Sequence, residues 1–104
     1  MNVAWNRLCL VEELQESGAL ELVVAGRVLA AFQTEEGVQV VDGMCAHQGG
    51  PLAQGHLDKT CITCPWHGWQ YDLCDGRNLL TNKKMLEVFP AEIRGEEIWV
   101  LMPE

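Results

Sequence analysis

Residues 44–72, MCAHQGGPLAQGHLDKTCITCPWHGWQYD, decide the fold and the chemistry of this chain. The stretch contains two short pairs of metal-binding side chains, Cys45-x-His47 and Cys64-x-x-His67, with sixteen residues between the pairs. Glycine and proline flank both pairs, and these residues favour tight turns over regular helix. The pattern therefore predicts two loops that meet around a metal centre.

The two pairs, their separation and the flanking sequence CPWHGW resemble the Rieske iron–sulfur proteins. In that family one iron of a [2Fe–2S] cluster is bound by two Cys and the other by two His. The resemblance implies one [2Fe–2S] cluster, with Cys45 and Cys64 on the inner iron and His47 and His67 on the outer iron. It also implies an all-β fold of three small antiparallel sheets with a cluster-binding insert.

Length and composition are consistent with one globular domain over residues 1–104. The chain is 48% hydrophobic, a content typical of folded domains. No run of about eighteen apolar residues is present, which excludes a membrane-spanning helix. The first residues lack a basic region followed by an apolar core. We therefore expect a cytoplasmic protein without a secretory signal.

The formal net charge is −8, from fifteen acidic and seven basic residues. This balance argues against nucleic-acid binding, which needs a basic face. An acidic carrier could be steered towards a partner with a basic patch. The alternative is that the acidic surface only keeps the protein soluble.

Short apolar and β-branched runs separated by glycine turns predict strands joined in hairpins. Residues 11–14 are expected to form a short turn or a single helical turn, and Pro90 indicates an edge or bulge in its strand. Loops are expected at 52–59 and 78–84. The expected strands cover residues 4–9, 19–24, 27–33, 38–41, 60–63, 69–71, 87–93 and 97–101.

Other uses of the cysteines and histidines were weighed. A structural zinc site could combine Cys61-x-x-Cys64 with Cys45 and His47, but it would leave His67 without a role. The five cysteines are an odd number, which fits a disulfide framework poorly. Cys9, Cys61 and Cys74 are therefore expected to be free thiols, and His56 an ordinary loop histidine.

Departures from the high-potential Rieske proteins predict a low-potential centre. Those proteins carry an extra Cys in each ligand loop, joined as a disulfide, where this chain has Gly50 and Trp66. They also place a serine two residues after the second ligand histidine, where Trp69 stands here. Tyr71 matches a tyrosine that donates to a cysteine sulfur. With fewer hydrogen-bond donors to the sulfurs, the negative charge of the reduced cluster is stabilised less, and the reduction potential is therefore lower.

The resemblance implies a non-enzymatic, one-electron carrier, a Rieske-type ferredoxin that passes electrons from a flavin-dependent reductase to a terminal ring-hydroxylating oxygenase. A second possibility is the small Rieske subunit of a larger reductase, such as assimilatory nitrite reductase. A third is an interaction module without redox function, which the intact ligand set argues against. The chain itself has no second iron site for oxygen activation, because only His56 remains unused. Docking is expected around His47 and His67, on an apolar patch of Gly49, Gly50, Pro51, Leu52 and Trp66.

Overall fold

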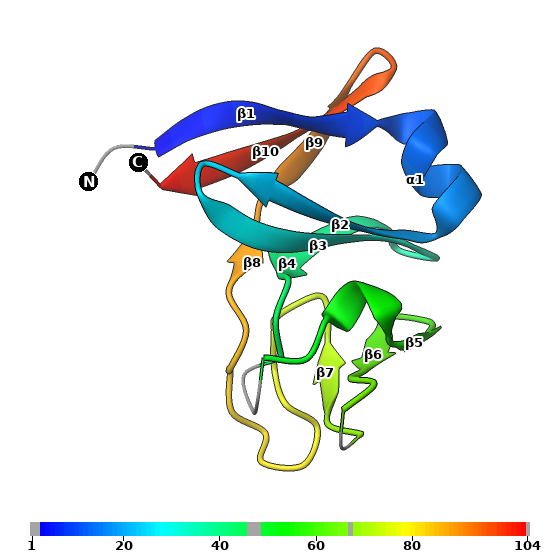
Figure 1. The fold of residues 1–104 in the computed structure, drawn as a ribbon, viewed down its shortest axis with the longest axis vertical. Helices are drawn as coiled ribbons and strands as arrows, with labels where there is room; N and C mark the ends of the chain where they lie inside the picture. Colours follow the sequence, from blue (N-terminus) through cyan, green and yellow to red (C-terminus); the bar gives the residue numbers. More distant parts are fainter. Residues whose placement is uncertain (1–2, 46–48, 67, 104) are drawn as a thin grey trace.

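A computed structural model describes residues 3–45, 49–66 and 68–103 of the chain (Figure 1). It is built almost entirely from antiparallel strands in three sheets, of order β1-β10-β9, β2-β3-β4-β8 and β5-β6-β7. The all-β prediction and the prediction of three small antiparallel sheets are therefore confirmed. The elements are β1 (Val3–Leu10), α1 (Val11–Ser17), β2 (Ala19–Val24), β3 (Arg27–Thr34), β4 (Gly37–Asp42), η1 (Leu52–Gln54), β5 (His56–Asp58), β6 (Cys61–Thr63), β7 (Gln70–Asp72), β8 (Val88–Phe89), β9 (Ala91–Arg94) and β10 (Glu97–Pro103).

The β2-β3-β4-β8 sheet lies in the middle of the molecule and is buried on both faces. Successive side chains of a strand point to opposite faces, so Leu29 and Ala31 of β3 pack in one apolar core while Ala30 and Phe32 pack in another. The first core is shared with β1, α1 and β10. The second core is shared with the segment that carries the two cysteine loops. This explains why residues 29–32 form one continuous buried run without alternation.

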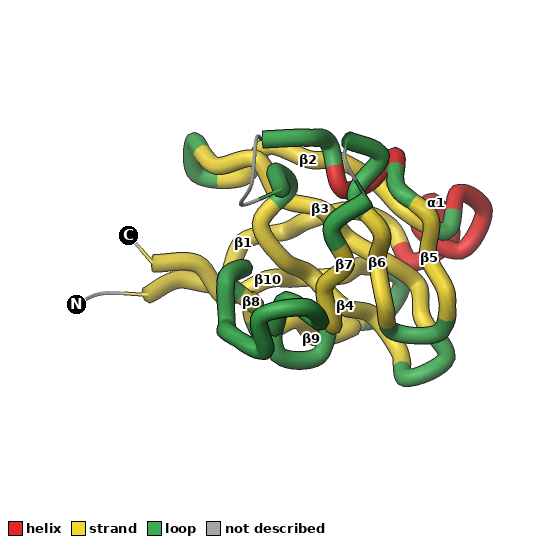
Figure 2. The backbone as a smooth tube through the Cα atoms, turned by 90° about the horizontal axis from the view of Figure 1, so that it is seen from below, coloured by secondary structure: helices red, strands yellow, loops and turns green. Residues whose placement is uncertain are grey.

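Two parts of the molecule follow from this layering. We call residues 3–42 and 87–103 the base, and residues 43–86 the cluster lobe. Figure 1 shows the lobe, with η1 and the β5-β6-β7 sheet, below the central sheet. Viewed from below in Figure 2, β5, β6 and β7 lie across the strands of the base. The lobe side chains Leu52, Ile62, Tyr71, Leu73 and Leu86 pack against the base in the second core, which we call the lobe core, so the lobe is held by packing.

The junction between base and lobe is fixed by charge and by close packing. Arg27 lies 2.9 Å from Asp42 and 3.0 Å from Glu87, which joins β3 to the ends of β4 and β8. The Asp42 carboxylate also accepts a hydrogen bond from the backbone N–H of Glu87 at 2.9 Å. Gly43 follows, where an added Cβ would lie 2.6 Å from a Val28 methyl carbon. The chain therefore enters the lobe at a fixed point.

Three local predictions need correction. A single strand was expected over residues 87–93, but Pro90 divides it, so that β8 joins the central sheet and β9 pairs with β10. The edge position indicated by Pro90 is confirmed, because β8 and β9 are each the edge strand of their sheet. The reason is that proline cannot donate the ladder hydrogen bond. Residues 52–59 contain η1 and β5 where only loop and turn were expected. The helical turn at 11–14 extends to Ser17, where Gly18 ends it with φ +79°.

No helix among the described residues is long and apolar enough to cross a membrane.

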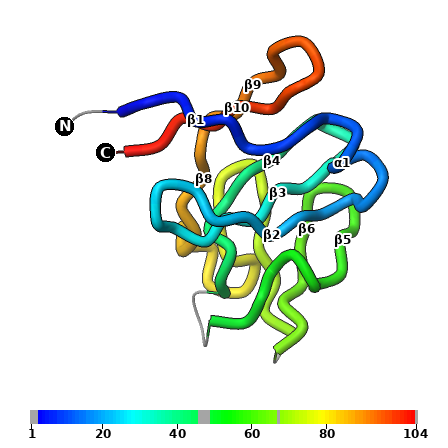
Figure 3. Tube along the Cα trace, turned by 45° about the horizontal axis from the view of Figure 1, so that its top comes forward, coloured from blue at the N-terminus to red at the C-terminus, as the bar shows by residue number. Residues whose placement is uncertain are grey.

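In Figure 3 the β9–β10 hairpin of the base lies at one end of the molecule and the cluster lobe lies at the other end.

Candidate metal centre

The two predicted ligand cysteines are both buried in the lobe. Cys45 is 4% exposed and Cys64 is 2% exposed. Cys45 follows β4 after a two-residue connection, and Cys64 follows β6 directly. Backbone hydrogen bonds close both loops: Cys45 donates to Gly50 at 2.8 Å, and Cys64 donates to Trp69 at 2.7 Å. The segments in which glycine and proline flank the ligand pairs thus form two tight loops, as the sequence predicts.

Each of the two sulfur atoms has a polar group at hydrogen-bonding distance. The Tyr71 hydroxyl oxygen lies 3.1 Å from Cys45 Sγ, and both residues are buried. The backbone N–H of Trp66 donates to Cys64 Sγ at 3.4 Å. These neighbours suit metal-binding thiolates: a Cys45 thiolate can only accept, and the Tyr71 hydroxyl would then be the donor, as the Trp66 N–H is to Cys64 Sγ. The predicted contact between Tyr71 and a cysteine sulfur is present.

The two thiols also lie close to each other. Burial raises the pKa of the Cys64 thiol, and the neighbouring Cys45 raises it further, whereas the Trp66 N–H acts in the opposite direction. Binding to a metal would offset the unfavourable free energy of deprotonating these buried thiols, because a coordinated thiol is deprotonated outright. The arrangement of Cys45 and Cys64 therefore fits a site where soft thiolate ligands bind the iron of an iron–sulfur cluster.

The two predicted histidine ligands, His47 and His67, lie outside the described residues. The described residues on either side of them are Cys45 and Gly49 for the first loop and Trp66 and Gly68 for the second.

The zinc alternative does not match the geometry. Cys45, Cys61 and Cys64 are all described, yet no three His, Cys, Asp or Glu side chains within the described ranges converge as a metal site. Cys61 instead lies near Asp58 and Asp72, which raise the pKa of its thiol together with burial, the larger cause. Cys9, Cys61 and Cys74 are not in disulfides.

Gly50 and Trp66, which replace the disulfide cysteines of the high-potential proteins, lie side by side. A Cβ built on Gly50 would be 3.0 Å from Trp66 Cγ and 2.8 Å from Cys64 Sγ. The indole ring thus occupies the space beside the glycine, and nothing larger than glycine fits without a shift. Trp66 itself is 49% exposed, whereas Trp69 is half-buried and packs against the lobe core.

One residue of the site region was not predicted. Asn78 was placed in an exposed loop, but it is 2% exposed. Its side-chain oxygen accepts hydrogen bonds from the backbone N–H groups of Leu80 at 2.9 Å and Thr81 at 3.0 Å. Asparagine often makes such local turns, but the sequence around Asn78 carries no signal that its side chain is buried. The expected loop histidine, His56, begins β5 and is exposed.

Comparison with known families settles the class of the protein. Residues 4–90 match the model of the Rieske [2Fe–2S] domain. The chain belongs to the Rieske family. Its cofactor is one [2Fe–2S] cluster, in agreement with the buried pair of cysteines.

Relatives of this Rieske protein include carriers of similar length. It is 27% identical to the ferredoxin component of the naphthalene 1,2-dioxygenase system of Pseudomonas aeruginosa, over 96% of this chain and 97% of the relative. A chain in the solved complex of reduced oxygenase and oxidized ferredoxin in carbazole 1,9a-dioxygenase superposes with a TM-score of 0.82. It is 26% identical, and the match covers 92% of this chain and 91% of that one.

A putative small subunit of an NADPH nitrite reductase has the same fold, with a TM-score of 0.79, over 93% of this Rieske chain and 97% of that one. Its identity is 16%, so this likeness concerns the fold alone.

Proposed function

We propose that this Rieske protein is a one-electron carrier that takes electrons from a flavin-dependent reductase and delivers them to a terminal ring-hydroxylating oxygenase. The observation that carries the proposal is the match to a dioxygenase-system ferredoxin over 96% of this chain, joined to a buried pair of cysteines whose sulfurs lie within hydrogen-bonding distance of the Tyr71 hydroxyl and the Trp66 N–H. We place the protein in the cytoplasm, where such a reductase would work.

The ligands in this proposal are Cys45, His47, Cys64 and His67. When bound, the cluster accepts and releases single electrons. The protein contributes the surroundings: the lobe core excludes water from both sulfurs. The Tyr71 hydroxyl and the Trp66 N–H stabilise negative charge on them.

The protein is proposed to be a component of an oxidoreductase system and not itself an enzyme. Ring-hydroxylating oxygenases bind a mononuclear iron through two His and a carboxylate. Beyond the proposed cluster ligands, only His56 is left in this sequence, and it is exposed at the start of β5.

Reconstitution with purified components tests the proposal. The holoprotein is mixed with NADH, a flavin-dependent ferredoxin reductase and, in parallel, a panel of terminal oxygenases that includes naphthalene and carbazole dioxygenases. We expect substrate-dependent NADH oxidation with at least one oxygenase, dependent on the concentration of this protein. Transfer to an assimilatory nitrite reductase and to none of the oxygenases would favour the second possibility and overturn the proposal.

A further inference from the structure

The segment between the buried residues Asn78 and Leu86 is exposed at every position, from 79 to 85. We call it the Leu80 loop. Leu80 is 89% exposed, which no other large hydrophobic side chain of the described ranges exceeds, and its neighbour Leu79 is 43% exposed. A single exposed hydrophobic residue needs no explanation. Two adjacent leucines on the lobe that holds the cofactor indicate a contact surface.

The Leu80 loop is held in one conformation. Besides the two hydrogen bonds that the Asn78 side chain accepts, the Asn78 backbone donates to the Lys83 carbonyl at 2.8 Å and accepts from the Asn82 N–H at 2.8 Å. The Leu79 N–H donates to the Gln70 carbonyl at 3.0 Å, which ties the loop to β7. A contact loop that is already ordered loses little conformational freedom on binding.

The loop lies beside the second cysteine loop. Figure 1 shows both at the lower end of the lobe, far from the β9–β10 hairpin. A hollow lies between them, and its lining comes from both loops: Gly68, Trp69, Gln70, Asn78, Leu80 and Thr81. A partner side chain seated in this hollow would touch Leu80 and the backbone next to residue 67.

The expected apolar docking patch is only partly at the surface. Gly50 and Leu52, two of its five members, are buried. Gly49 and Trp66 are exposed, and Pro51 is half-buried. The Leu80 loop therefore adds two exposed leucines, Leu79 and Leu80, that were not part of the expected docking patch.

Charge is divided unequally between the two parts of the molecule. The base has eleven carboxylate side chains and three arginines, whereas the lobe has three carboxylates, one arginine and three lysines. Arg77 lies 3.7 Å from Asp72 and 3.9 Å from Asp75, so these charges compensate one another. Lys83 and Lys84 of the Leu80 loop are exposed and make no ion pair among the described residues.

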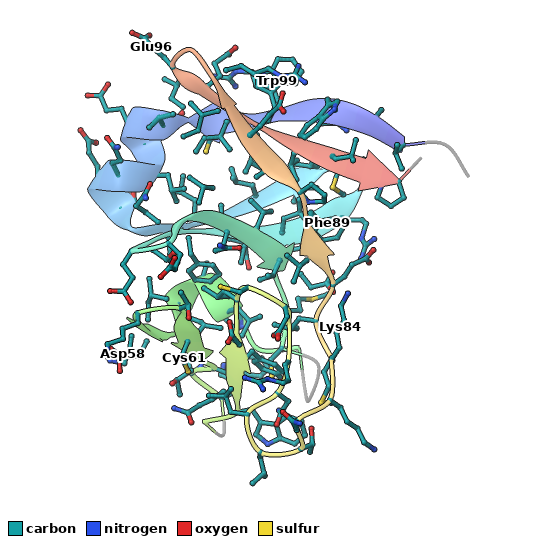
Figure 4. The ribbon with its side chains drawn as sticks, turned by 180° about the vertical axis from the view of Figure 1, so that it is seen from behind. Asp58, Cys61, Lys84, Phe89, Glu96 and Trp99 are labelled. Atoms are coloured by element: carbon teal, nitrogen blue, oxygen red, sulfur yellow. The ribbon has the colours of Figure 1, made fainter. Side chains whose placement is uncertain are left out.

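Distance limits the influence of the acidic base at the contact. The molecule extends 36 Å along its longest axis, whereas charges at about 0.1 M salt are screened over about 10 Å. Figure 4 shows Glu96 at the opposite end of the molecule from Asp58, Cys61 and Lys84, with Lys84 on the other side of the lobe from Asp58 and Cys61. Lys84 also lines a hollow with Asp42 and Glu87 at the junction. A partner that contacts the Leu80 loop therefore meets Lys83 and Lys84 of that loop, whereas distant base carboxylates such as Glu96 are screened from it.

We propose that the Leu80 loop is a preformed docking element for the terminal oxygenase, and that it fits an oxygenase surface with an apolar hollow for Leu80 and a rim of carboxylates facing Lys83 and Lys84. The inference rests on the proposed function and deepens it. It reverses the expectation of a basic partner patch, because the proposed partner surface is acidic where it meets Lys83 and Lys84.

The test uses the holoprotein and the oxygenase that accepts its electrons in the reconstitution above, followed by stopped-flow absorbance. Leu80→Ser removes the apolar contact, and its matched control is Val23→Ser, because Val23 is 71% exposed on the base strand β2. We expect Leu80→Ser to raise the half-saturating protein concentration about tenfold, in line with the loss of one buried leucine side chain. Val23→Ser should leave it within about twofold, as expected for a surface substitution away from the contact.

The contribution of charge is tested with the double variant Lys83→Gln/Lys84→Gln, and the control is Lys59→Gln, in the connection between β5 and β6. We expect the double variant to slow association about tenfold at low salt and to flatten the fall of the rate with added salt. Lys59→Gln should keep most of the salt dependence.

The outcomes separate the two proposals. If wild-type protein reduces no oxygenase, the proposed function fails. If it does, but Leu80→Ser behaves as Val23→Ser, or the association rate rises with salt, the docking proposal is overturned and the proposed function stands. In every variant, an unchanged visible absorption spectrum and midpoint potential show that the cluster is intact.

Discussion

Replacing Tyr71 by Phe removes one hydroxyl and leaves the buried ring in place, which isolates its contact with Cys45 Sγ at 3.1 Å. A hydrogen bond to a charged acceptor contributes about 1.5–3 kcal/mol. The proposed Cys45 thiolate is charged in both oxidation states, so only the difference between the states affects the potential. We take this difference as about 1 kcal/mol, a fraction of the whole bond.

Because the reduced cluster carries one more negative charge, the donor stabilises it more. For a one-electron couple, a factor of ten in the equilibrium constant is about 59 mV. We therefore expect Tyr71→Phe to lower the midpoint potential by about 40 mV, measured by protein-film voltammetry at neutral pH.

Thr63→Val provides the matched control. It removes a hydroxyl from the strand that leads into Cys64, but that hydroxyl accepts a hydrogen bond from Gln70 at 3.2 Å and the bond involves no sulfur. Iron content and the electron paramagnetic resonance spectrum should show an intact cluster in both variants. A shift below about 10 mV in Tyr71→Phe, or an equal shift in Thr63→Val, would refute the assigned role of the hydroxyl.

Four further outcomes are expected. The wild-type potential should lie near the low end of the Rieske range, on the order of −150 mV, because no second cysteine or serine donor stands at Gly50, Trp66 or Trp69; voltammetry would contradict this with a value above about +100 mV. Cys64→Ser should lose the cluster, whereas Cys61→Ser and Cys74→Ser should keep it, as measured by iron and sulfide content; zinc in place of iron would contradict the ligand assignment. Gly50→Ala should destabilise the protein by about 1–3 kcal/mol through overpacking against Cys64 Sγ and Trp66, seen as a lower thermal midpoint; an unchanged midpoint would show that the loop yields easily. Asn78→Ala should cost about 1–3 kcal/mol in the free energy of unfolding, because the Leu80 and Thr81 N–H groups lose their acceptor; chemical denaturation checks this, and no change would mean that water replaces it.

The strands could be predicted from sequence because their signals are local. Residues 19–24 and 27–33 were read from their apolar character and the glycine turn between them, and β2 and β3 lie there. The prediction failed where the partner of a strand decided the outcome. In the sequence, Pro90 indicates only that one backbone hydrogen bond between strands cannot form. Whether the chain then bends, bulges or moves to another sheet depends on β4 and β10, the strands that pair with β8 and β9.

The ligand pairs could also be recognised in the sequence, because a cluster needs particular donor atoms at short spacing within each loop. The sequence by itself therefore determined the family, the cofactor and the candidate ligands Cys45, His47, Cys64 and His67. The environment of those ligands was determined only by the tertiary structure. Tyr71 reaches a cysteine 26 positions away, and Gly50 lies against Trp66 because the two loops fold onto one lobe core. The Leu80 loop was expected from its polar sequence to be exposed, but only the structure shows that Asn78 and Leu86 at its ends are buried while Leu79 and Leu80 between them are exposed. Such long-range contacts depend on register and packing across the whole chain, which no local pattern encodes.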